Sequence, residues 1–314
     1  MNLRTLLLPL LMGAPGLGLL AQAPMADIAY PFELEYQDLP GSPRIAYTEQ
    51  AGEGPTLLLV HGLGSYAPAW SKLLEKMDGR HCIALDLPGY GKSAPPADTV
   101  SLKGYARTLA SFIRAKNLEK VVLVGHSMGG QVGLWLALLE PGLLEGLVLL
   151  APAGFETFTP QQGQMLRNFT TPEALQNTPP DKVRASYEFN FHGRQLPEDA
   201  AFMLADRLQM QEQEATFQAY CEGVARSVHA MLREPVFGRL PEIHLPVLVF
   251  FGQDDLLIPN RLFHPDLTPE KVGQMGVEQL PDARLVMLPD CGHFVLWDQA
   301  GSVAQQIEAF LERR

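Results

Sequence analysis

The sequence predicts an α/β fold built on a mostly parallel, doubly wound sheet. Short aliphatic runs that are typical of buried parallel strands alternate with longer segments of helical spacing. The clearest of these runs lie at residues 56–60, 81–86, 120–124, 145–151 and 246–251. Strands that alternate with helices are connected by crossovers, so this order indicates a parallel sheet.

The remaining elements of the expected core follow in chain order. Residues 32–38 and 44–49 alternate apolar and polar side chains, which predicts an antiparallel hairpin at the sheet edge. A further strand is expected at residues 284–288. Helical spacing predicts helices at residues 66–77, 101–116, 131–140 and 299–313.

Residues 154–240 differ in character from the rest of the chain. They lack aliphatic strand runs, are rich in Gln, Met, Phe and Glu, and place apolar side chains at helical spacing between Phe202 and Val224. We interpret this segment as a helical cap inserted over the site. The α/β core is then formed by residues 24–153 and 241–314.

The first residues have the three-part pattern of a secretory signal peptide. A short basic start is followed by an apolar run through Leu20 and by small residues, which assigns residues 1–23 to the signal. We therefore expect an exported protein, periplasmic or secreted, and a cytoplasmic one if this segment is not a signal. No other stretch is long and apolar enough to span a bilayer, so no stable membrane insertion is expected after processing.

Length and charge narrow the range of partners. The chain has 314 residues, 46% of them hydrophobic, which is enough for one large core and an inserted cap. Its formal net charge of −11 argues against binding to nucleic acid or to anionic lipid, because phosphate groups repel an acidic protein. Three cysteines, Cys82, Cys221 and Cys291, permit at most one disulfide.

No cofactor or metal ion is expected. The glycine-rich residues 86–93 lack the spacing of a phosphate-binding loop. Five histidines have no metal-like spacing relative to one another or to cysteine, and are interpreted as structural or surface groups: His81, His192, His229, His244 and His264.

Residues 125–130, with the sequence Gly-His-Ser-Met-Gly-Gly, carry the strongest chemical signal. They lie between a buried strand and a helix, so Ser127 falls at the apex of a sharp strand-to-helix turn. Gly125 and Gly129, on either side of this turn, allow the adjoining elements to approach closely. The Met128 amide, at the helix N-terminus, is directed to where an oxyanion would form.

Three further loops follow the ends of strands and complete the pattern. The loop at residues 61–64 can present a second amide, that of Leu63, to the same oxyanion. Candidate carboxylates follow the strand at 246–251, where Asp254 and Asp255 are adjacent and cannot be separated by sequence. Glu156 is a third candidate, and His293 follows the last strand. Serine, acid and histidine in this chain order, each past a strand's carboxyl end, indicate a catalytic triad.

Together these motifs resemble α/β-hydrolases of the serine type, a group that includes esterases, lipases, haloperoxidase-like enzymes and carbon–carbon bond hydrolases. The matching residues are 61–64, 86–93, 125–130, 252–259 and 292–293. The resemblance implies an α/β-hydrolase fold. It also selects Asp255 over Asp254, because in this family the acid lies three residues past the loop glycine and a proline follows four residues later.

The residue types predict a mechanism. Ser127 is the expected nucleophile, His293 the base that takes its proton, and Asp255 the partner that holds the histidine. The Leu63 and Met128 amides form the expected oxyanion hole. Five further residues are expected to line or brace the site: His61, Gly62, His126, Phe294 and Trp297.

The expected activity is hydrolysis of a small-molecule carboxylic ester, with an apolar substrate if the Met and Phe side chains of the cap face inward. Alternatives on the same fold are a carbon–carbon bond hydrolase of the meta-cleavage type, a lactone or amide hydrolase, and a perhydrolase. A non-catalytic binding protein is a further alternative, which the intact Ser127, Asp255 and His293 disfavour. The oligomeric state is left open.

Overall fold

The computed structural model describes residues 23–96 and 99–313. Apart from Ala23, the signal peptide predicted at residues 1–23 lies outside the described residues.

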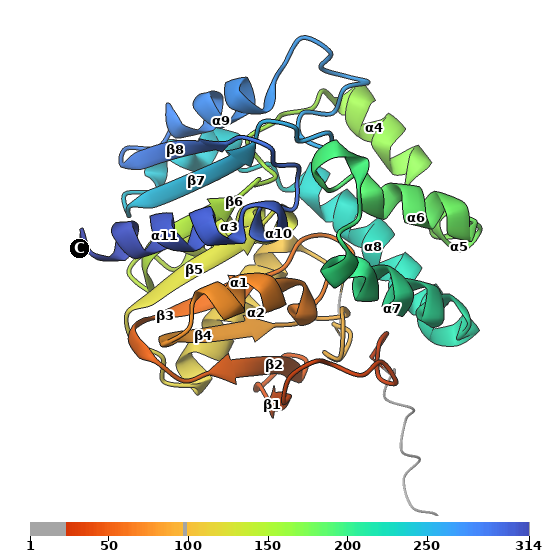
Figure 1. The fold of residues 1–314 in the computed structure, drawn as a ribbon, viewed down its shortest axis with the longest axis horizontal. Coiled ribbons are helices and arrows are strands. Elements are labelled where there is room, and N and C mark those ends of the chain that lie inside the picture. Colours follow the sequence, from red (N-terminus) through yellow and green to blue (C-terminus); the bar gives the residue numbers. More distant parts are fainter. Residues whose placement is uncertain (1–22, 97–98, 314) are drawn as a thin grey trace, which may run out of the picture.

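The described residues form an eight-stranded sheet with helices on both faces (Figure 1). The strands lie in the order β1-β2-β4-β3-β5-β6-β7-β8, and all pairs are parallel except β1–β2 and β2–β4. This topology confirms the predicted fold class and the antiparallel hairpin at the edge. The strands are β1 (Glu35–Gln37), β2 (Ile45–Gln50), β3 (Glu53–Val60), β4 (Arg80–Leu85), β5 (Val121–His126), β6 (Leu144–Leu150), β7 (Val247–Gly252) and β8 (Ala283–Leu288).

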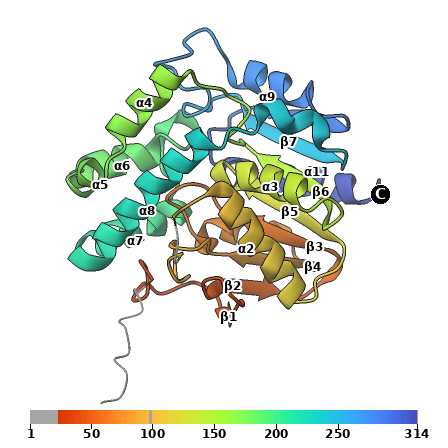
Figure 2. The same cartoon turned by 180° about the vertical axis from the view of Figure 1, so that it is seen from behind.

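Helices cover both faces of the sheet (Figures 1 and 2). Helices α1 (Ser71–Lys76) and α11 (Ala300–Leu311) lie on one face, and α2 (Leu102–Ala115) and α3 (Met128–Leu139) lie on the other. Strands β5 and β7 are buried at every position as a result, which is why they are continuous apolar runs. The other core helices are η1 (Ala67–Trp70), η4 (Phe237–Glu242), α9 (Pro269–Val277) and α10 (Val295–Asp298).

A helical insertion separates β6 from β7 and stands beside the core (Figures 1 and 2). Its first two helices begin at threonine caps, Thr159 and Thr171, each followed by proline at a first-turn position where the missing N–H has no helical acceptor to lose. The insertion comprises α4 (Pro160–Phe169), α5 (Pro172–Gln176), α6 (Pro180–Glu188), η2 (His192–Arg194), η3 (Glu198–Ala200), α7 (Ala201–Gln211) and α8 (Glu214–Arg233).

Hydrogen bonds fasten the end of α8 to the core. Tyr90 Oη donates to Ser227 Oγ at 2.7 Å in a fully buried contact. The carbonyl of Glu234 accepts from Gln131 Nε2 at 3.1 Å and from Trp135 Nε1 at 3.0 Å. Because both donors lie on α3, the insertion is held against the helix that begins at Ser127.

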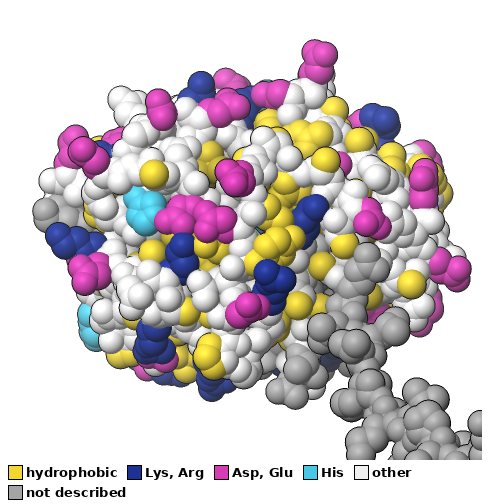
Figure 3. Space-filling model, turned by 90° about the horizontal axis from the view of Figure 1, so that it is seen from below, with side chains coloured by type: hydrophobic (Ala, Val, Ile, Leu, Met, Phe, Trp, Pro, Cys, Tyr) yellow, Lys and Arg dark blue, Asp and Glu magenta, His cyan; other side chains and the backbone are white. Residues whose placement is uncertain are grey.

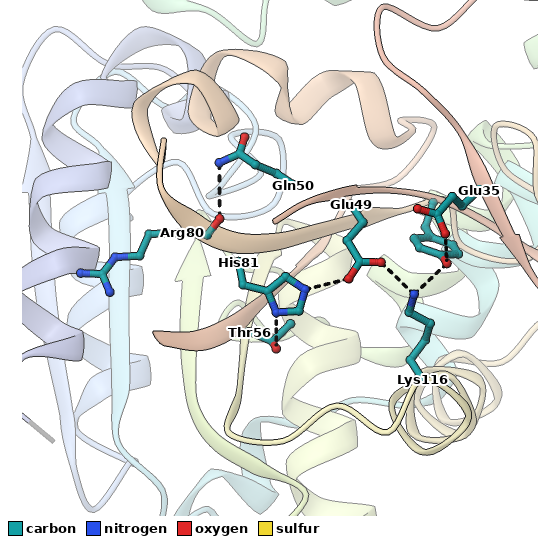
Figure 4. Close-up of polar contacts among 8 residues, drawn as sticks. Glu35, Glu49, Gln50, Thr56, Arg80, His81 and Lys116 are labelled. Carbon is teal, nitrogen blue, oxygen red and sulfur yellow. Dashed lines mark hydrogen bonds and ion pairs between the residues drawn. The ribbon is translucent and has the colours of Figure 1, made fainter. Parts of the chain in front are cut away.

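A polar network links the edge strands to α2, away from the cavity described below (Figure 4). Glu49 on β2 accepts from Lys116 Nζ at 2.7 Å and contacts His81 Nε2 at 2.8 Å. The other ring nitrogen of His81 lies 2.9 Å from Thr56 Oγ1 on β3. One carboxylate therefore joins elements from both the antiparallel and the parallel part of the sheet.

The surface carries charges of both signs. On the face shown in Figure 3, acidic and basic side chains are interspersed with apolar ones. Among the described helices, none combines the length and the apolar character that crossing a bilayer requires.

We predict that Gly129→Ala destabilises the fold by about 3 kcal/mol through overpacking. A Cβ at this position would lie 2.1 Å from the Val60 carbonyl oxygen, so β3 and α3 would have to separate. Urea unfolding of both proteins measures the difference.

Gly301→Ala is the matched control. Gly301 is also a helical glycine, but a Cβ there meets no atom within 4 Å, and alanine should raise stability by up to about 1 kcal/mol. Equal effects of the two substitutions would contradict the proposed role of close packing at Gly129.

Candidate active site

Ser127 occupies a strained backbone conformation between β5 and α3. Its φ of 50° and ψ of −116° lie in a region that residues with a side chain rarely adopt. The neighbouring elements hold this conformation: Ser127 N donates to Leu150 O at 2.9 Å, and Ser127 O accepts from Gly130 N and Ala153 N, each at 3.0 Å. The serine therefore stands on a rigid turn above the end of the sheet.

His293 and Asp255 form a buried pair. His293 Nδ1 lies 2.8 Å from Asp255 Oδ2, and Asp255 is completely inaccessible. The other carboxylate oxygen, Oδ1, accepts from Leu257 N at 2.8 Å and from Ile258 N at 3.0 Å. Because an ionised carboxylate only accepts hydrogen bonds, this pairing assigns the proton to Nδ1 and leaves Nε2 as an acceptor.

The neighbouring Asp254 points the opposite way. It is exposed, and its Oδ2 lies 2.8 Å from Nδ1 of His192, which is also exposed. With Asp290, these side chains bring ligand atoms within 4.8 Å of one another, close enough to surround a cation. Exposed acidic groups commonly gather without a metal, and we assign no metal site here.

Glu156, the third candidate acid, contacts other residues and not His293. It accepts from Asn260 N at 2.8 Å and pairs with His264 Nδ1. Burial is the main reason why the pKa of Glu156 is raised. Asp255 is thus the candidate carboxylate that contacts His293.

A cavity of about 930 Å³ lies between the core and the helical insertion, and Ser127 and His293 both line it. Among the described residues, no hydrogen bond joins Ser127 Oγ to His293 Nε2. Such contacts are often long in unliganded enzymes and shorten when substrate binds. The insertion contributes mostly apolar and aromatic side chains to the wall, among them Leu166, Leu175, Val183, Tyr187, Met203, Tyr220, Val224 and Met231.

The two amides expected to bind an oxyanion are available as donors. Leu63 lines the cavity and Met128 is the first residue of α3, and neither backbone N–H has an acceptor in the described part of the chain. Gly62 allows the Leu63 loop to approach the turn, since a Cβ on Gly62 would lie 2.9 Å from His126 Nδ1.

His61 braces this loop from behind and does not line the cavity. Its Nδ1 donates to Gly62 O at 2.8 Å, and its Nε2 accepts from Leu87 N at 3.0 Å. Complete burial lowers the pKa of His61 to about 4. The imidazole is therefore neutral at physiological pH, in a single tautomer.

His126 lines the cavity and packs against His293. The two ring centroids are 4.9 Å apart, and His126 Nε2 donates to His293 O at 3.1 Å. Burial, and then the nearby His293, lower the pKa of His126 well below its ordinary value. Phe294 also lines the cavity, with its ring 4.9 Å from that of His126.

Trp297 and Cys291 lie apart from these groups. The indole Nε1 of Trp297 donates to Ala69 O at 2.6 Å, which turns the ring toward the core beside α1, and the residue does not line the cavity. Cys291 is a buried free thiol, and so are Cys82 and Cys221. Burial raises the pKa of all three thiols.

The contacts between the insertion and the core near the site were not predicted from the sequence. Tyr220 Oη donates to Gly64 O at 3.0 Å, and Tyr66 donates to Asp206, so the insertion contacts the candidate oxyanion loop and the residues just after it. Arg207, which lines the cavity, was also not singled out, although the sequence shows it as one cation within the apolar stripe of α7.

Comparison with known proteins agrees with the fold described above. Residues 57–306 match the model of the alpha/beta hydrolase family. A 2-hydroxy-6-oxo-6-(2'-aminophenyl)hexa-2,4-dienoic acid hydrolase from Metapseudomonas resinovorans is 29% identical over 274 residues, covering 84% of this chain and 87% of that protein. A 2-hydroxy-6-oxononadienedioate/2-hydroxy-6-oxononatrienedioate hydrolase from Paraburkholderia phymatum is 28% identical, covering 85% and 91%.

Among solved structures, a thermophilic esterase from Thermogutta terrifontis superimposes with a TM-score of 0.70. It is 25% identical to this chain, and the match covers 90% of this chain and 99% of the esterase.

We predict that His61→Gln reduces the dependence of stability on acidic pH. Because the pKa of His61 is about 4 in the folded state and about 6.5 in the unfolded chain, the unfolded state binds the extra proton between these values. The wild type should lose stability as pH falls through this window, by up to about 1.4 kcal/mol per unit from this residue. Urea unfolding at several pH values between 4 and 7 measures both slopes.

Both proteins retain the other buried titratable groups. The contributions of those groups to the dependence of stability on pH therefore do not affect the difference between the two slopes. Burial raises the pKa of Asp86 to about 6, which gives the opposite slope in each protein. Identical slopes for wild type and His61→Gln would mean that His61 does not stay neutral.

Proposed function

The chain belongs to the alpha/beta hydrolase family, and from this premise we propose that it hydrolyses carboxylic esters through a serine-bound acyl intermediate. The observation that carries the proposal is the arrangement of three side chains. Ser127 on its strained turn and His293 line one cavity, while Asp255 accepts from His293 at 2.8 Å behind it.

In the first proposed step, His293 Nε2 takes the proton of Ser127 as its Oγ attacks the ester carbonyl carbon. Asp255 stabilises the imidazolium that forms and keeps the ring oriented. The Leu63 and Met128 amides donate to the tetrahedral oxyanion, each worth about 3–4 kcal/mol in the transition state. His293 then gives its proton to the leaving alcohol.

In the second step, water attacks the acyl-serine. His293 takes a proton from the water, the same two amides stabilise the oxyanion, and the proton returns to Ser127 as the acid leaves. The low pKa of His126 fits a supporting role for this neighbour. A neutral ring beside His293 does not oppose the positive charge that His293 acquires.

The cavity supports a small organic substrate. Its volume of about 930 Å³ lies within the range of ligand sites, and its wall is mostly apolar. An ester with an apolar portion fits this lining.

A second candidate is hydrolysis of a carbon–carbon bond of the meta-cleavage type. The two curated relatives favour it, because both are named as hydrolases of 2-hydroxy-6-oxo acids. Against this stand their modest identities and the esterase among the structural relatives. Lactone or amide hydrolysis and perhydrolysis use the same groups and remain outcomes of substrate testing.

We also propose that the protein is exported, on the pattern of residues 1–23. Expressed with these residues, it should appear in the periplasm or medium with a new N-terminus near residue 24. Fractionation followed by mass spectrometry of the intact protein measures this. Full-length protein confined to the cytoplasm would contradict the proposal.

For the reaction itself, we predict that Ser127→Ala abolishes turnover of p-nitrophenyl esters, from acetate to palmitate, by about a million-fold. Asp255→Asn should lower kcat by roughly ten thousand-fold, because the amide favours the wrong tautomer of His293. Stopped and continuous assays of nitrophenol release measure both effects.

Asp254→Asn is the control for the adjacent position. Its exposed contact with His192 contributes little, so kcat should stay within about twofold of wild type. A larger loss at Asp254 than at Asp255 would overturn the assignment of the acid. A folded protein that cleaves no ester would shift the proposal to the carbon–carbon substrates.

A further inference from the structure

We propose that Arg207 forms an anion-binding subsite in the cavity, and that the ester substrate carries a carboxylate which this guanidinium binds. This inference rests on the proposed function. The mostly apolar cavity wall by itself indicates an apolar substrate, and the inference adds a charged group to it.

Arg207 lies in an unusual position for an arginine. It is on α7 among buried side chains of the same helix, including Met203, Leu204 and Met210, and is itself only 6% exposed. It also lines the cavity that contains Ser127 and His293. A long cationic side chain normally extends its charge into water, and this one does not.

The charge of Arg207 has no counter-ion within the described residues, where no ion pair includes it. Its Nη1 is buried and makes no hydrogen bond to any described atom. The nearest residue in sequence that could pair with it, Asp206, accepts from Tyr66 instead. A buried cation without a counter-ion is strongly unfavourable, so an anionic ligand that reaches the guanidinium from the cavity offsets part of that cost.

Two aromatic rings hold the guanidinium in place. Its Cζ lies 4.4 Å from the ring centroid of Phe217 and 5.1 Å from that of Tyr220. These cation–π contacts stabilise the charge, and the Tyr220 side chain also makes a hydrogen bond with Arg207, while Nη1 is left without an acceptor. Tyr220 commits its own hydroxyl hydrogen to Gly64 O. The site is therefore preorganised before any ligand enters.

A carboxylate matches this subsite best. The fork of a guanidinium pairs with the two oxygens of a carboxylate, and one positive charge balances one negative charge. A phosphate monoester brings about two negative charges. The other cavity arginine, Arg167, already donates from Nη2 to Gln164.

The test compares two esters that differ in one terminal group. p-Nitrophenyl hexanoate is neutral, and mono-p-nitrophenyl adipate has an acyl chain of the same length that ends in a carboxylate. Arg207→Gln should lower kcat/KM for the adipate ester by about 30-fold, which is the loss expected for a hydrogen bond to a charged group. It should change the hexanoate value by less than about threefold. Arg207→Lys keeps the charge without the fork and should fall between the two.

Arg226→Gln is the matched control. Arg226 lies on α8 in the same insertion, but it is at the surface and pairs with Glu222. It should leave both kcat/KM values unchanged. Thermal unfolding supplies a second readout: removing an unpaired buried cation should leave Tm unchanged or raise it, whereas removal of a structural arginine would lower Tm.

A binding measurement tests the Arg207 subsite independently of the proposed esterase activity. In a Ser127→Ala background, calorimetry should show monomethyl adipate binding about 30-fold more weakly after Arg207→Gln. Ester turnover that requires Ser127 but gives the same adipate-to-hexanoate ratio with and without Arg207 would overturn the subsite and leave the esterase proposal standing. Arg207-dependent binding without turnover of either ester would overturn the esterase proposal and retain the subsite.

Discussion

The close approach of the end of β3 to the first turn of α3 is the contact on which the site depends. Gly129 has no side chain, and the Val60 carbonyl occupies the space that a Cβ would need. This contact lies between the end of β3, which the Leu63 loop follows, and the start of α3 at Met128. Ser127, whose strained backbone conformation is held by hydrogen bonds to Leu150 and Ala153, lies on the same turn. A single backbone contact thus lies next to both the candidate nucleophile and the candidate oxyanion donors.

The elements with strong local signals were predictable from the sequence. Buried parallel strands are continuous apolar runs, which predicted the sheet. The candidate site was predicted from the glycines around Ser127 and from the chain order of Ser127, Asp255 and His293. Helix α9 was not predicted. It contains Gly273 and Gly276, which weaken helical propensity, and close packing accounts for both: a Cβ on Gly276 would lie 2.0 Å from the ring of Phe155, and one on Gly273 would lie 2.7 Å from Leu285 Cδ1.

Side-chain direction could not be predicted in the same way. Asp254 and Asp255 are chemically identical neighbours, and only the backbone path of their loop turns one to solvent and the other to His293. Trp297 follows His293 closely in sequence, yet its indole contacts Ala69 in the core and does not line the cavity. The environment of Arg207 could not be predicted either, because its aromatic neighbours come from a different helix.

The helical insertion does more than line the cavity. Its Tyr220 holds Gly64, and its Asn190 carbonyl accepts from Phe294 N at 2.9 Å, next to His293. The insertion is therefore not an interchangeable module that could be replaced to change substrate preference while the catalytic core stays the same. A transplanted cap would have to reproduce these backbone contacts as well as a new pocket. Changes in specificity by way of the cap are consequently coupled to the geometry of the reaction centre.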